Sequence, residues 1–334
     1  MQGPGALLAT TSETSDVGAV MAAVADTLRA WVGLGPAFLA TADPVTGAFS
    51  GTFAFDIPDA AAAAFYANEL SGQDVVTFTS LAAASVPVDS LFSATDGQPQ
   101  RSARWREVIS PLGWGDELRA AIQCEGRPWG YLCLHRECAE PRFMAKDLSR
   151  LTNVLPVIAG ALRRVALAAV RDDLRLDTGV ILFDEQARMI GSTGGAAAWL
   201  DELGPPGPDG LPLLVAGLAS HVLASRRSAT SAITTRTGRA GVLEAAVLDG
   251  SGAPQVVLVI SAASPARRLD QLAVASGLTP RELQVVQCVV SGHSTTAIAA
   301  KLGISPYTVQ AHLTSIFAKT GQRSRRDLIN QLRR

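Results

Sequence analysis

The sequence predicts a chain of several domains, in which two α+β domains are followed by a small all-α domain of four helices. Three observations lead to this prediction. The chain has 334 residues, which is more than one ordinary domain holds. Of these residues, 48% are hydrophobic and 18% are charged, which excludes a largely disordered protein. The predicted strands all lie before residue 263, and the segment from residue 278 onward shows only helical patterns.

The first α+β domain is expected over residues 16–170, after a Gly-, Ser- and Thr-rich N-terminus (1–15) that we expect to be flexible. A helical period begins after Asp16. Segments 37–56 and 119–136 each consist of two apolar stretches around turn residues, which is typical of β-hairpins. Residues 147–171 return to helical spacing, with Pro156 as a residue that can kink or break the helix.

The helix predicted at 147–171 carries apolar residues at alternating steps of three and four. They are Leu148, Leu151, Leu155, Ile158, Leu162, Val165 and Ala169. A heptad-like seam of this kind fits a helix that pairs with a second copy of the chain in a dimer. It fits equally well a helix that packs on the sheet of its own domain, and the sequence does not separate the two arrangements.

A smaller α+β domain is expected over residues 175–262, followed by a linker at 263–277, into which the segment SAASPARR (261–268) leads. Its predicted elements are a strand–turn–strand unit at 179–190, a helix at 196–203, a loop at 204–212, a helix at 211–224 and a hairpin at 241–261. Two strands, two helices and two further strands form a unit of the size of a small sensor domain.

The C-terminal domain is expected over residues 278–334, where four short helices have clear start and stop signals. Thr279 and Glu282 form a capping box around Pro280, and Ser294 and Ser305 can cap the second and third helices. Helix, glycine-containing turn and helix in this order indicate a helix-turn-helix unit. From Pro265 to the end the chain has ten basic and three acidic residues, a net charge of +7, which is typical of nucleic-acid binders.

The third helix of this domain has two different faces. Val309, Leu313, Ile316 and Phe317 are expected to pack inward against Ile298, Leu302 and Ile304. The opposite face carries Gln310, Ala311 and Thr314, whose small or amide side chains fit the major groove of DNA. Residues expected to bind phosphates surround this face: Lys301, Lys319, Arg323, Arg325 and Arg326, with the hydroxyls of Ser294, Thr295 and Thr296.

The segment LTPRELQVVQCVVSGHSTTAIAAKLGISPYTVQAHLTSIFAKTGQRSRRDL resembles the LuxR-type helix-turn-helix domain of bacterial transcription regulators along its whole length. This resemblance implies that the third helix recognises DNA and that the fourth contributes to a dimer contact. It implies DNA contacts at Thr308, Gln310, Ala311, His312, Thr314 and Lys319. The family commonly has a basic residue at the positions of Gln310 and Thr314, so we expect a different base preference here.

The region 16–170 resembles a GAF domain, and 175–262 resembles a PAS domain; both families commonly enclose a small molecule or act as dimerising spacers. Ligand-binding candidates on this basis are Trp105, Trp114, Trp129, Tyr131, Cys133 and His135, the last four of which an extended strand places on one face. The alternative is that these side chains belong to the core. Cys133, His135 and Cys138 lack the second ligand pair of a zinc site, so we expect no bound metal.

Several absences narrow the function. The sequence has no GxxxxGK[ST] phosphate loop, no receiver-like acidic cluster with a strand-end lysine, and no GxSxG or HExxH motif, so we expect neither an enzyme nor a bound cofactor. It has no apolar run of membrane-spanning length, no signal peptide and only four cysteines, so we expect a cytoplasmic protein.

The sequence therefore predicts a dimeric transcription regulator that binds double-stranded DNA and responds to a small molecule. The alternative is a ligand-binding sensor or an enzyme whose C-terminal domain only docks to another protein. The two hypotheses differ in whether the C-terminal domain has any affinity for DNA.

Overall fold

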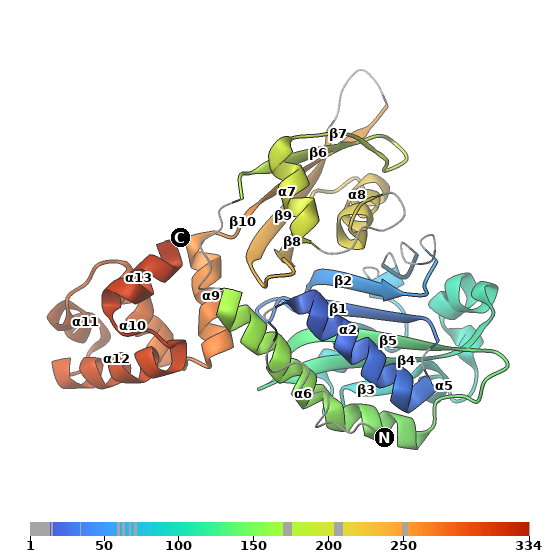
Figure 1. Ribbon diagram of the computed structural model, residues 1–334, viewed down its shortest axis with the longest axis horizontal. Coiled ribbons are helices and arrows are strands. Elements are labelled where there is room, and N and C mark those ends of the chain that lie inside the picture. Colours follow the sequence, from blue (N-terminus) through green and yellow to red (C-terminus); the bar gives the residue numbers. More distant parts are fainter. Residues whose placement is uncertain are drawn as a thin grey trace.

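The computed structural model describes residues 14, 16–33, 35–58, 61, 64–66, 68–69, 72–169, 176–203, 210–248 and 253–333. Three expected features, the N-terminal tail, most of the loop at 204–212 and the turn at 249–252, lie outside these residues. Two antiparallel sheets with helices occupy the N-terminal part, and a group of helices forms the C-terminal part (Figure 1). The α+β class predicted for the first two domains and the all-α class predicted for the last are confirmed.

The first sheet has five strands in the order β2-β1-β5-β4-β3. Both predicted hairpins are present: β1 (Ala37–Ala42) with β2 (Phe49–Phe55), and β4 (Trp114–Cys124) with β5 (Arg127–Glu137). The short edge strand β3 (Val88–Ser90) was not predicted, because three residues are too few for an alternating pattern. Helices α2 (Val17–Leu28) and α6 (Ala145–Ala169) lie side by side on one face of this sheet (Figure 1), as the resemblance to a GAF domain implies.

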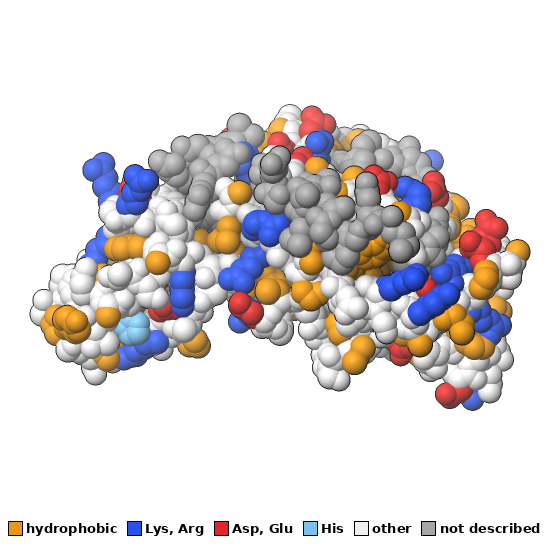
Figure 2. Space-filling model, turned by 60° about the horizontal axis from the view of Figure 1, so that its bottom comes forward, with side chains coloured by type: hydrophobic (Ala, Val, Ile, Leu, Met, Phe, Trp, Pro, Cys, Tyr) orange, Lys and Arg blue, Asp and Glu red, His pale blue; other side chains and the backbone are white. Residues whose placement is uncertain are grey.

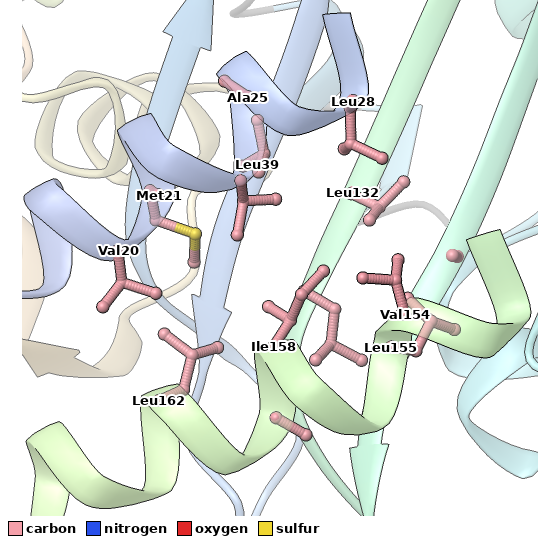
Figure 3. Close-up of a cluster of buried hydrophobic side chains, with 14 of the residues drawn as sticks. Val20, Met21, Ala25, Leu28, Leu39, Leu132, Val154, Leu155, Ile158 and Leu162 are labelled. Carbon is pink, nitrogen blue, oxygen red and sulfur yellow. The ribbon is translucent and has the colours of Figure 1, made fainter. Parts of the chain in front are cut away.

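The core of the first domain lies between this pair of helices and the sheet (Figure 3). Val20 and Met21 of α2, and Ile158 and Leu162 of α6, converge on Leu39 of β1 and are at most 4% exposed. Burial of side chains of this size contributes about 1.5–3 kcal/mol each to the free energy of unfolding.

The apolar seam of α6 packs inside its own domain. Its residues Leu151, Leu155, Ile158, Leu162 and Val165 are at most 4% exposed within a single chain. The seam is therefore not the dimer contact that the sequence left open. By length and composition α6 could cross a membrane, but this face is core. Pro156 lies on its exposed side without breaking the helix.

Short helical segments cover part of the other face of the first sheet. They are α4 (Phe78–Ala83), α5 (Leu91–Ala94) and the single turns Pro99–Arg101, Trp105–Ile109 and Ser110–Leu112, while Arg29–Gly33 extends α2. Phe78 of α4, Phe49 of β2 and Tyr131 of β5 pack together on this face, whereas Phe53 of β2 and Trp129 of β5 belong to the core under the α2–α6 pair.

The second sheet has five strands in the order β7-β6-β10-β9-β8, which repeats the order of the first sheet. Its strands are β6 (Gly179–Phe183), β7 (Met189–Ser192), β8 (Ala229–Thr234), β9 (Ala240–Leu248) and β10 (Gln255–Ala262). The predicted helices are present as α7 (Gly194–Glu202) and α8 (Leu213–Ser225). Strand β8 was not predicted, because its small and polar residues do not alternate with apolar ones.

The two α+β domains share one core. Ile181, Trp199 and Leu218 of the second domain belong to the same buried cluster as Phe49 and Tyr131 of the first. Strand β8 and helix α8 pack against β2. The second domain therefore covers part of the face of the first sheet that the α2–α6 pair leaves open.

The expectation that residues 263–277 form a linker is wrong, because Pro265–Ser276 forms helix α9. Ser264 caps this helix by accepting a hydrogen bond from the Arg267 amide, and Pro265 occupies its first position. Leu269 and Leu272 lie in the core of the C-terminal domain. A Pro-Ala-Arg-Arg segment resembles a linker in composition, but its apolar residues repeat at helical spacing and gain a buried partner in the folded chain.

The C-terminal domain contains the four predicted helices, α10 (Pro280–Val290), α11 (Thr295–Leu302), α12 (Pro306–Thr320) and α13 (Arg325–Arg333). The predicted caps are present: Thr279 and Glu282 form the capping box, and the Ser294 and Ser305 hydroxyls accept from the amides of Ala297 and Thr308. Gly303, between α11 and α12, has a φ of +65°, which glycine adopts without steric cost.

Candidate functional site

Helix α12 presents the two faces that the sequence predicts. Val309, Leu313 and Ile316 are at most 1% exposed and pack in the core of the C-terminal domain. Gln310, Ala311 and Thr314 are exposed on the opposite side, and the Thr314 hydroxyl donates to the Gln310 carbonyl at 3.1 Å. His312 and Thr308 lie at the border and are half-buried, and the Thr308 and Ser305 hydroxyls are 2.8 Å apart. The exposed face combines an amide, a methyl group and a hydroxyl, the groups that contact base edges in a major groove.

Glu282 fixes α12 to α10. Its carboxylate accepts hydrogen bonds from the Ser315 hydroxyl at 2.6 Å, from the Lys319 ammonium at 2.7 Å and from the Thr279 amide at 2.7 Å. Burial raises the pKa of Glu282, but these hydrogen bonds outweigh burial and lower it to about 2. Lys319, a predicted phosphate contact, is thus ion-paired within the chain, with its side chain 33% exposed and two N–H donors still directed elsewhere.

The start of α11 is joined to α13 through Arg325. This guanidinium donates to the Thr295 hydroxyl at 2.8 Å and to the His293 carbonyl at 3.3 Å. Two of the predicted DNA-contacting residues therefore bind each other. Ser294 caps α11, and Thr296 is exposed beside it.

The surface of the C-terminal domain is basic and open. Lys301, Arg323 and Arg326 are exposed, and Tyr307 at the start of α12 is 85% exposed. Figure 2 shows Lys and Arg side chains at several points of the lobe that holds α10–α13, more often than Asp and Glu. The sequence analysis missed the exposed Tyr307, although its position directly after Ser305 and Pro306, at the start of α12, can be seen in the sequence.

A small cavity lies on the aromatic side of the first sheet. It is lined by Phe38, Phe49, Phe65, Tyr66, Glu69, Phe78, Arg119, Cys133 and His135. The empty space here is about 320 Å³ when the open solvent at its mouth is included, and the cavity itself admits only water-sized guests in this conformation. Of the predicted ligand-binding residues, the structure brings Cys133 and His135 into the wall of this cavity.

The other predicted ligand-binding residues lie elsewhere. Tyr131 is buried against Phe78, with ring centroids 4.8 Å apart. Trp114 stacks near His135 at 4.3 Å between ring centroids, and Trp105 packs in the same cluster as Trp114. Trp129, in contrast, belongs to the core under α2 and α6, so it does not share a face with Tyr131, Cys133 and His135.

A β-bulge explains the placement of Trp129. Ile122 pairs with Gly130 and Gln123 pairs with Pro128, so the register shifts between these pairs and Trp129 has no opposite residue. One extra residue reverses the alternation of side chains along the strand. The expectation that Trp129 shares one face of the strand with Tyr131, Cys133 and His135 is therefore wrong.

Buried charges lie beside the cavity. The Arg104 guanidinium donates to both oxygens of Glu117, at 2.7 Å from Nη2 to Oε2, and Arg119 donates to Glu69 at 2.7 Å. Burial raises the pKa of Glu117, but the charges of Arg104 and Arg119 outweigh it and lower that pKa to about 2. The sequence analysis missed this cluster, because no local pattern shows that Arg104, in a helical turn, and Glu117, on β4, will be buried together.

Cys133 and His135 continue this network. The Cys133 thiol lies 3.0 Å from Oε1 of Glu117, and its sulfur lies 3.3 Å from Nε2 of His135. Burial raises the pKa of Cys133 and lowers the pKa of His135 to about 4, so both groups are neutral near pH 7. The thiol then donates to Glu117, and Nε2–H of His135 donates to the sulfur.

Three potential metal-ligating atoms meet in this network. Those of Glu117, Cys133 and His135 lie within 4.8 Å of one another. Cys138, which the sequence grouped with Cys133 and His135, is exposed at the end of β5 and is not part of this group. Because both oxygens of Glu117 already accept hydrogen bonds from Arg104, its carboxylate is committed to the ion pair.

Comparison with known proteins concerns the C-terminal domain. Residues 276–332 match the model of a family described as bacterial regulatory proteins of the LuxR family. A Mycobacterium bovis protein named as a helix-turn-helix transcriptional regulator is 47% identical over 57 residues, and the transcriptional activator RamA of Corynebacterium glutamicum is 39% identical over 57 residues. These segments are 17% of this chain, 6% of the first protein and 20% of the second, so the likeness is that of one domain.

Among solved structures, SdiA of Escherichia coli is similar over 98% of this chain and 94% of its own, with a TM-score of 0.40 and 12% identity. The sequence match, the four capped helices and the two different faces of α12 all concern the C-terminal region alone. Residues 276–332 therefore form a helix-turn-helix domain of the bacterial LuxR family.

Proposed function

We propose that this protein is a cytoplasmic, sequence-specific transcription regulator that binds double-stranded DNA as a homodimer and responds to a signal in its N-terminal domains. The single observation that carries the proposal is the exposed face of α12, where Gln310, Ala311 and Thr314 lie opposite a fully buried seam. A helix anchored on one side and polar on the other fits the major groove.

The homodimer rests on the family resemblance, in which the fourth helix contributes to the contact between two copies. Helix α13 leaves Arg326, Asp327 and Asn330 exposed, so it has a free face for this role. Two copies would present two α12 helices, and we expect a target of two half-sites about one helical turn apart.

The response to a signal is supported by the position of α9, which contacts both the first domain and the C-terminal domain. Asp43, directly after β1, has a fully buried side chain that accepts a hydrogen bond from Arg267 of α9 at 2.8 Å. Arg163 of α6 donates to the Ala275 carbonyl of α9 at 2.6 Å. Since α9 also contributes Leu269 and Leu272 to the C-terminal core, a shift of the first sheet would move the helix-turn-helix domain.

The competing hypothesis is a sensor or enzyme whose C-terminal domain docks to another protein. The family match favours DNA binding, because the matched relatives are named as transcription regulators.

Binding to a labelled random-sequence duplex, followed by fluorescence anisotropy at a series of salt concentrations, separates these hypotheses. Contacts to several phosphates predict that the logarithm of the affinity falls linearly with the logarithm of the salt concentration, with a slope of about −0.9 per phosphate. Absence of DNA affinity at low salt, or an affinity that does not change with salt, would contradict the proposal.

A further inference from the structure

We propose that Glu117, Cys133 and His135 form a binding site for one divalent transition-metal ion, and that Zn²⁺ is the ion its donors suit best. The inference goes beyond the proposed function, because it concerns the first domain and holds whether or not the chain binds DNA. It rests on the spacing of three donor atoms, on a lone pair of Glu117, and on the net charge of the buried network around them.

The three donor atoms are spaced like the corners of a coordination shell. The Cys133 sulfur lies 3.0 Å from Oε1 of Glu117 and 3.3 Å from Nε2 of His135, and all three atoms lie within 4.8 Å of one another. Zinc bonds of about 2.0–2.3 Å in a tetrahedron separate neighbouring ligand atoms by about 3.4–3.6 Å. The two distances from the sulfur fall short of this by a few tenths of an ångström, so small side-chain shifts make room for an ion.

The sheet brings these donors together. Glu117 on β4 pairs directly with His135 on β5, and Cys133 lies two residues from His135 on the same strand. Opposite residues of an antiparallel pair, and residues two apart on one strand, point to the same face. All three residues are at most 3% exposed. The site is therefore built on two rigid strands, and little ordering is needed to bind an ion.

The donor set is one that zinc prefers. A thiolate, an imidazole and a carboxylate are all common zinc ligands, and three protein ligands leave a fourth position for water. Cys133 and His135 also belong to the wall of the cavity that admits water-sized guests. The sequence analysis expected no metal, because Cys133, His135 and Cys138 lack a second ligand pair. In the structure, Glu117 of the neighbouring strand stands where Cys138 was considered.

Glu117 keeps one lone pair for an ion while it remains paired with Arg104. Arg104 donates to Oε2 at 2.7 Å from Nη2 and at 2.9 Å from Nε, and Nε lies 3.1 Å from Oε1. A carboxylate oxygen has two lone pairs, and Oε1 also accepts from the Cys133 thiol at 3.0 Å. Metal-ligating carboxylates are themselves commonly hydrogen-bonded, which orients them. The ion would take the place of the thiol proton, and Arg104 would hold the carboxylate in position.

The net charge of the network favours exchange of this proton for a divalent ion. Among the described residues, its ion pairs join two guanidiniums and three carboxylates, a net charge of −1: Arg104, Arg119, Glu69, Asp74 and Glu117. On binding, the Cys133 thiol loses its proton to solvent and an ion with two positive charges enters. The network then becomes neutral, so the ion offsets the excess carboxylate in a region shielded from water.

The test uses the full-length protein, freed of metal by dialysis against a chelator, and Co²⁺ as a coloured substitute for Zn²⁺. We expect one Co²⁺ per chain, with a thiolate-to-cobalt charge-transfer band in the near ultraviolet and the visible bands of a tetrahedral ion. Zn²⁺ should bind with a Kd below about 1 μM and bleach these bands as it displaces Co²⁺.

Two cysteine variants assign the ion to this site. Cys133→Ser removes the thiolate with little change in volume, so the charge-transfer band should disappear and the affinity for Zn²⁺ should fall at least about hundredfold. Cys138→Ser is the matched control, because Cys138 is exposed directly after β5, and it should keep both the band and the affinity. Near-ultraviolet circular dichroism shows whether each variant is folded.

X-ray absorption at the zinc edge of the wild-type protein needs no variant, so it decides even where Cys133→Ser does not fold. We expect a shell with one sulfur at about 2.3 Å and nitrogen or oxygen atoms at about 2.0–2.2 Å.

Any of three results overturns the proposal: no charge-transfer band with excess Co²⁺; a band that folded Cys133→Ser keeps or that Cys138→Ser loses; or a zinc shell with no sulfur or with more than one. None of these readouts involves DNA. A protein that binds Zn²⁺ at this site but binds no duplex would instead contradict the proposed function and leave the metal site standing.

Discussion

In the proposed complex with DNA, Gln310 makes a specific base contact and Lys319, further along α12, represents the phosphate contacts. A glutamine can make two hydrogen bonds to an adenine edge, worth about 1–3 kcal/mol against other bases. We expect Gln310→Ala to relax base preference at one position of each half-site. Lys319→Ala should weaken all sequences similarly and make the salt slope shallower by about 1.

In vitro selection of bound duplexes, read by sequencing, measures the first effect, and anisotropy measures the second. Because Lys319 also pairs with Glu282, a thermal melt of Lys319→Ala must show that the domain is folded. If Gln310→Ala keeps its base preference and Lys319→Ala keeps its affinity for DNA, the DNA-facing side of α12 is assigned wrongly.

Glu282 determines the position of α12 and gives a pH-dependent prediction. Its pKa in the folded protein is about 2, below the ordinary value of 4.5, so its contribution to stability is complete above pH 4.5 and is lost as the pH falls toward 2. Glu282→Gln removes the charge-assisted hydrogen bonds, and we expect a loss of about 1–3 kcal/mol near pH 7. Urea unfolding at several pH values should show this difference shrinking below pH 4.5.

The control for Glu282 is Glu244→Gln, at an exposed position of β9. We expect its free energy of unfolding to match that of the wild type at every pH tested. A Glu282→Gln difference that stays constant down to pH 2 would contradict the assigned role of the carboxylate.

At the scale of elements, the buried carboxylate of Asp43 helps to hold α9 to the first domain, together with the hydrogen bond from Arg163 to the Ala275 carbonyl. Loss of one partner from a buried ion pair costs about 3–5 kcal/mol. We therefore expect Arg267→Ala to weaken the attachment of α9 and to increase hydrogen exchange of the amides that follow Pro265 in α9 by at least about tenfold. Arg188→Ala, which breaks the exposed ion pair with Asp184, should leave α9 unchanged. Equal exchange of α9 in the wild type and Arg267→Ala would show that this ion pair does not hold the helix.

The α6 seam gives a second prediction at this scale. Since Leu155 and Leu162 are buried within one chain, their replacement by Asp should unfold the first domain and not merely separate two copies. Near-ultraviolet circular dichroism should show lost tertiary structure in the double variant, whereas Asn153→Asp on the exposed side of α6 should keep it. A double variant that stays folded but becomes monomeric would instead show that the seam takes part in dimerisation.

The elements that the sequence predicts correctly are those with local signals. The capped helices α10–α13 and the two hairpins of the first sheet have start residues, turn residues and periodic apolar positions. Strands β3 and β8 lack such local signals. They are stabilised by pairing with β4 and β9, which follow them in the sequence. Helix α9 was mistaken for a linker because its stability depends on two cores that lie elsewhere in the sequence.

The site shows the same division. Burial of Val309 and exposure of Gln310 follow from helical spacing alone. The Arg104–Glu117 ion pair does not follow from helical or strand spacing, because it depends on a tertiary contact. The orientation of Trp129 does not follow from it either, because it depends on a one-residue bulge. Long-range pairing and register were therefore the information that the sequence could not supply.

At the scale of the whole molecule, the three parts are not independent units. The two α+β domains share one buried cluster, and Leu167 of α6 packs against both the first core and the C-terminal core. Figure 1 shows α9 between α6 and the helices α10–α13. This arrangement places the C-terminal domain at one end of the chain, and under the proposed function a shift of the first sheet would reposition it through α9.

The most direct test of the DNA-facing side of α12 is photo-crosslinking from a single position. A benzoyl-substituted phenylalanine at Gln310, in the full-length protein bound to duplex DNA, should crosslink to the DNA, whereas the same residue at the exposed Asp201 of α7 should not. Bound protein that crosslinks to DNA from Asp201 but not from Gln310 would contradict the account.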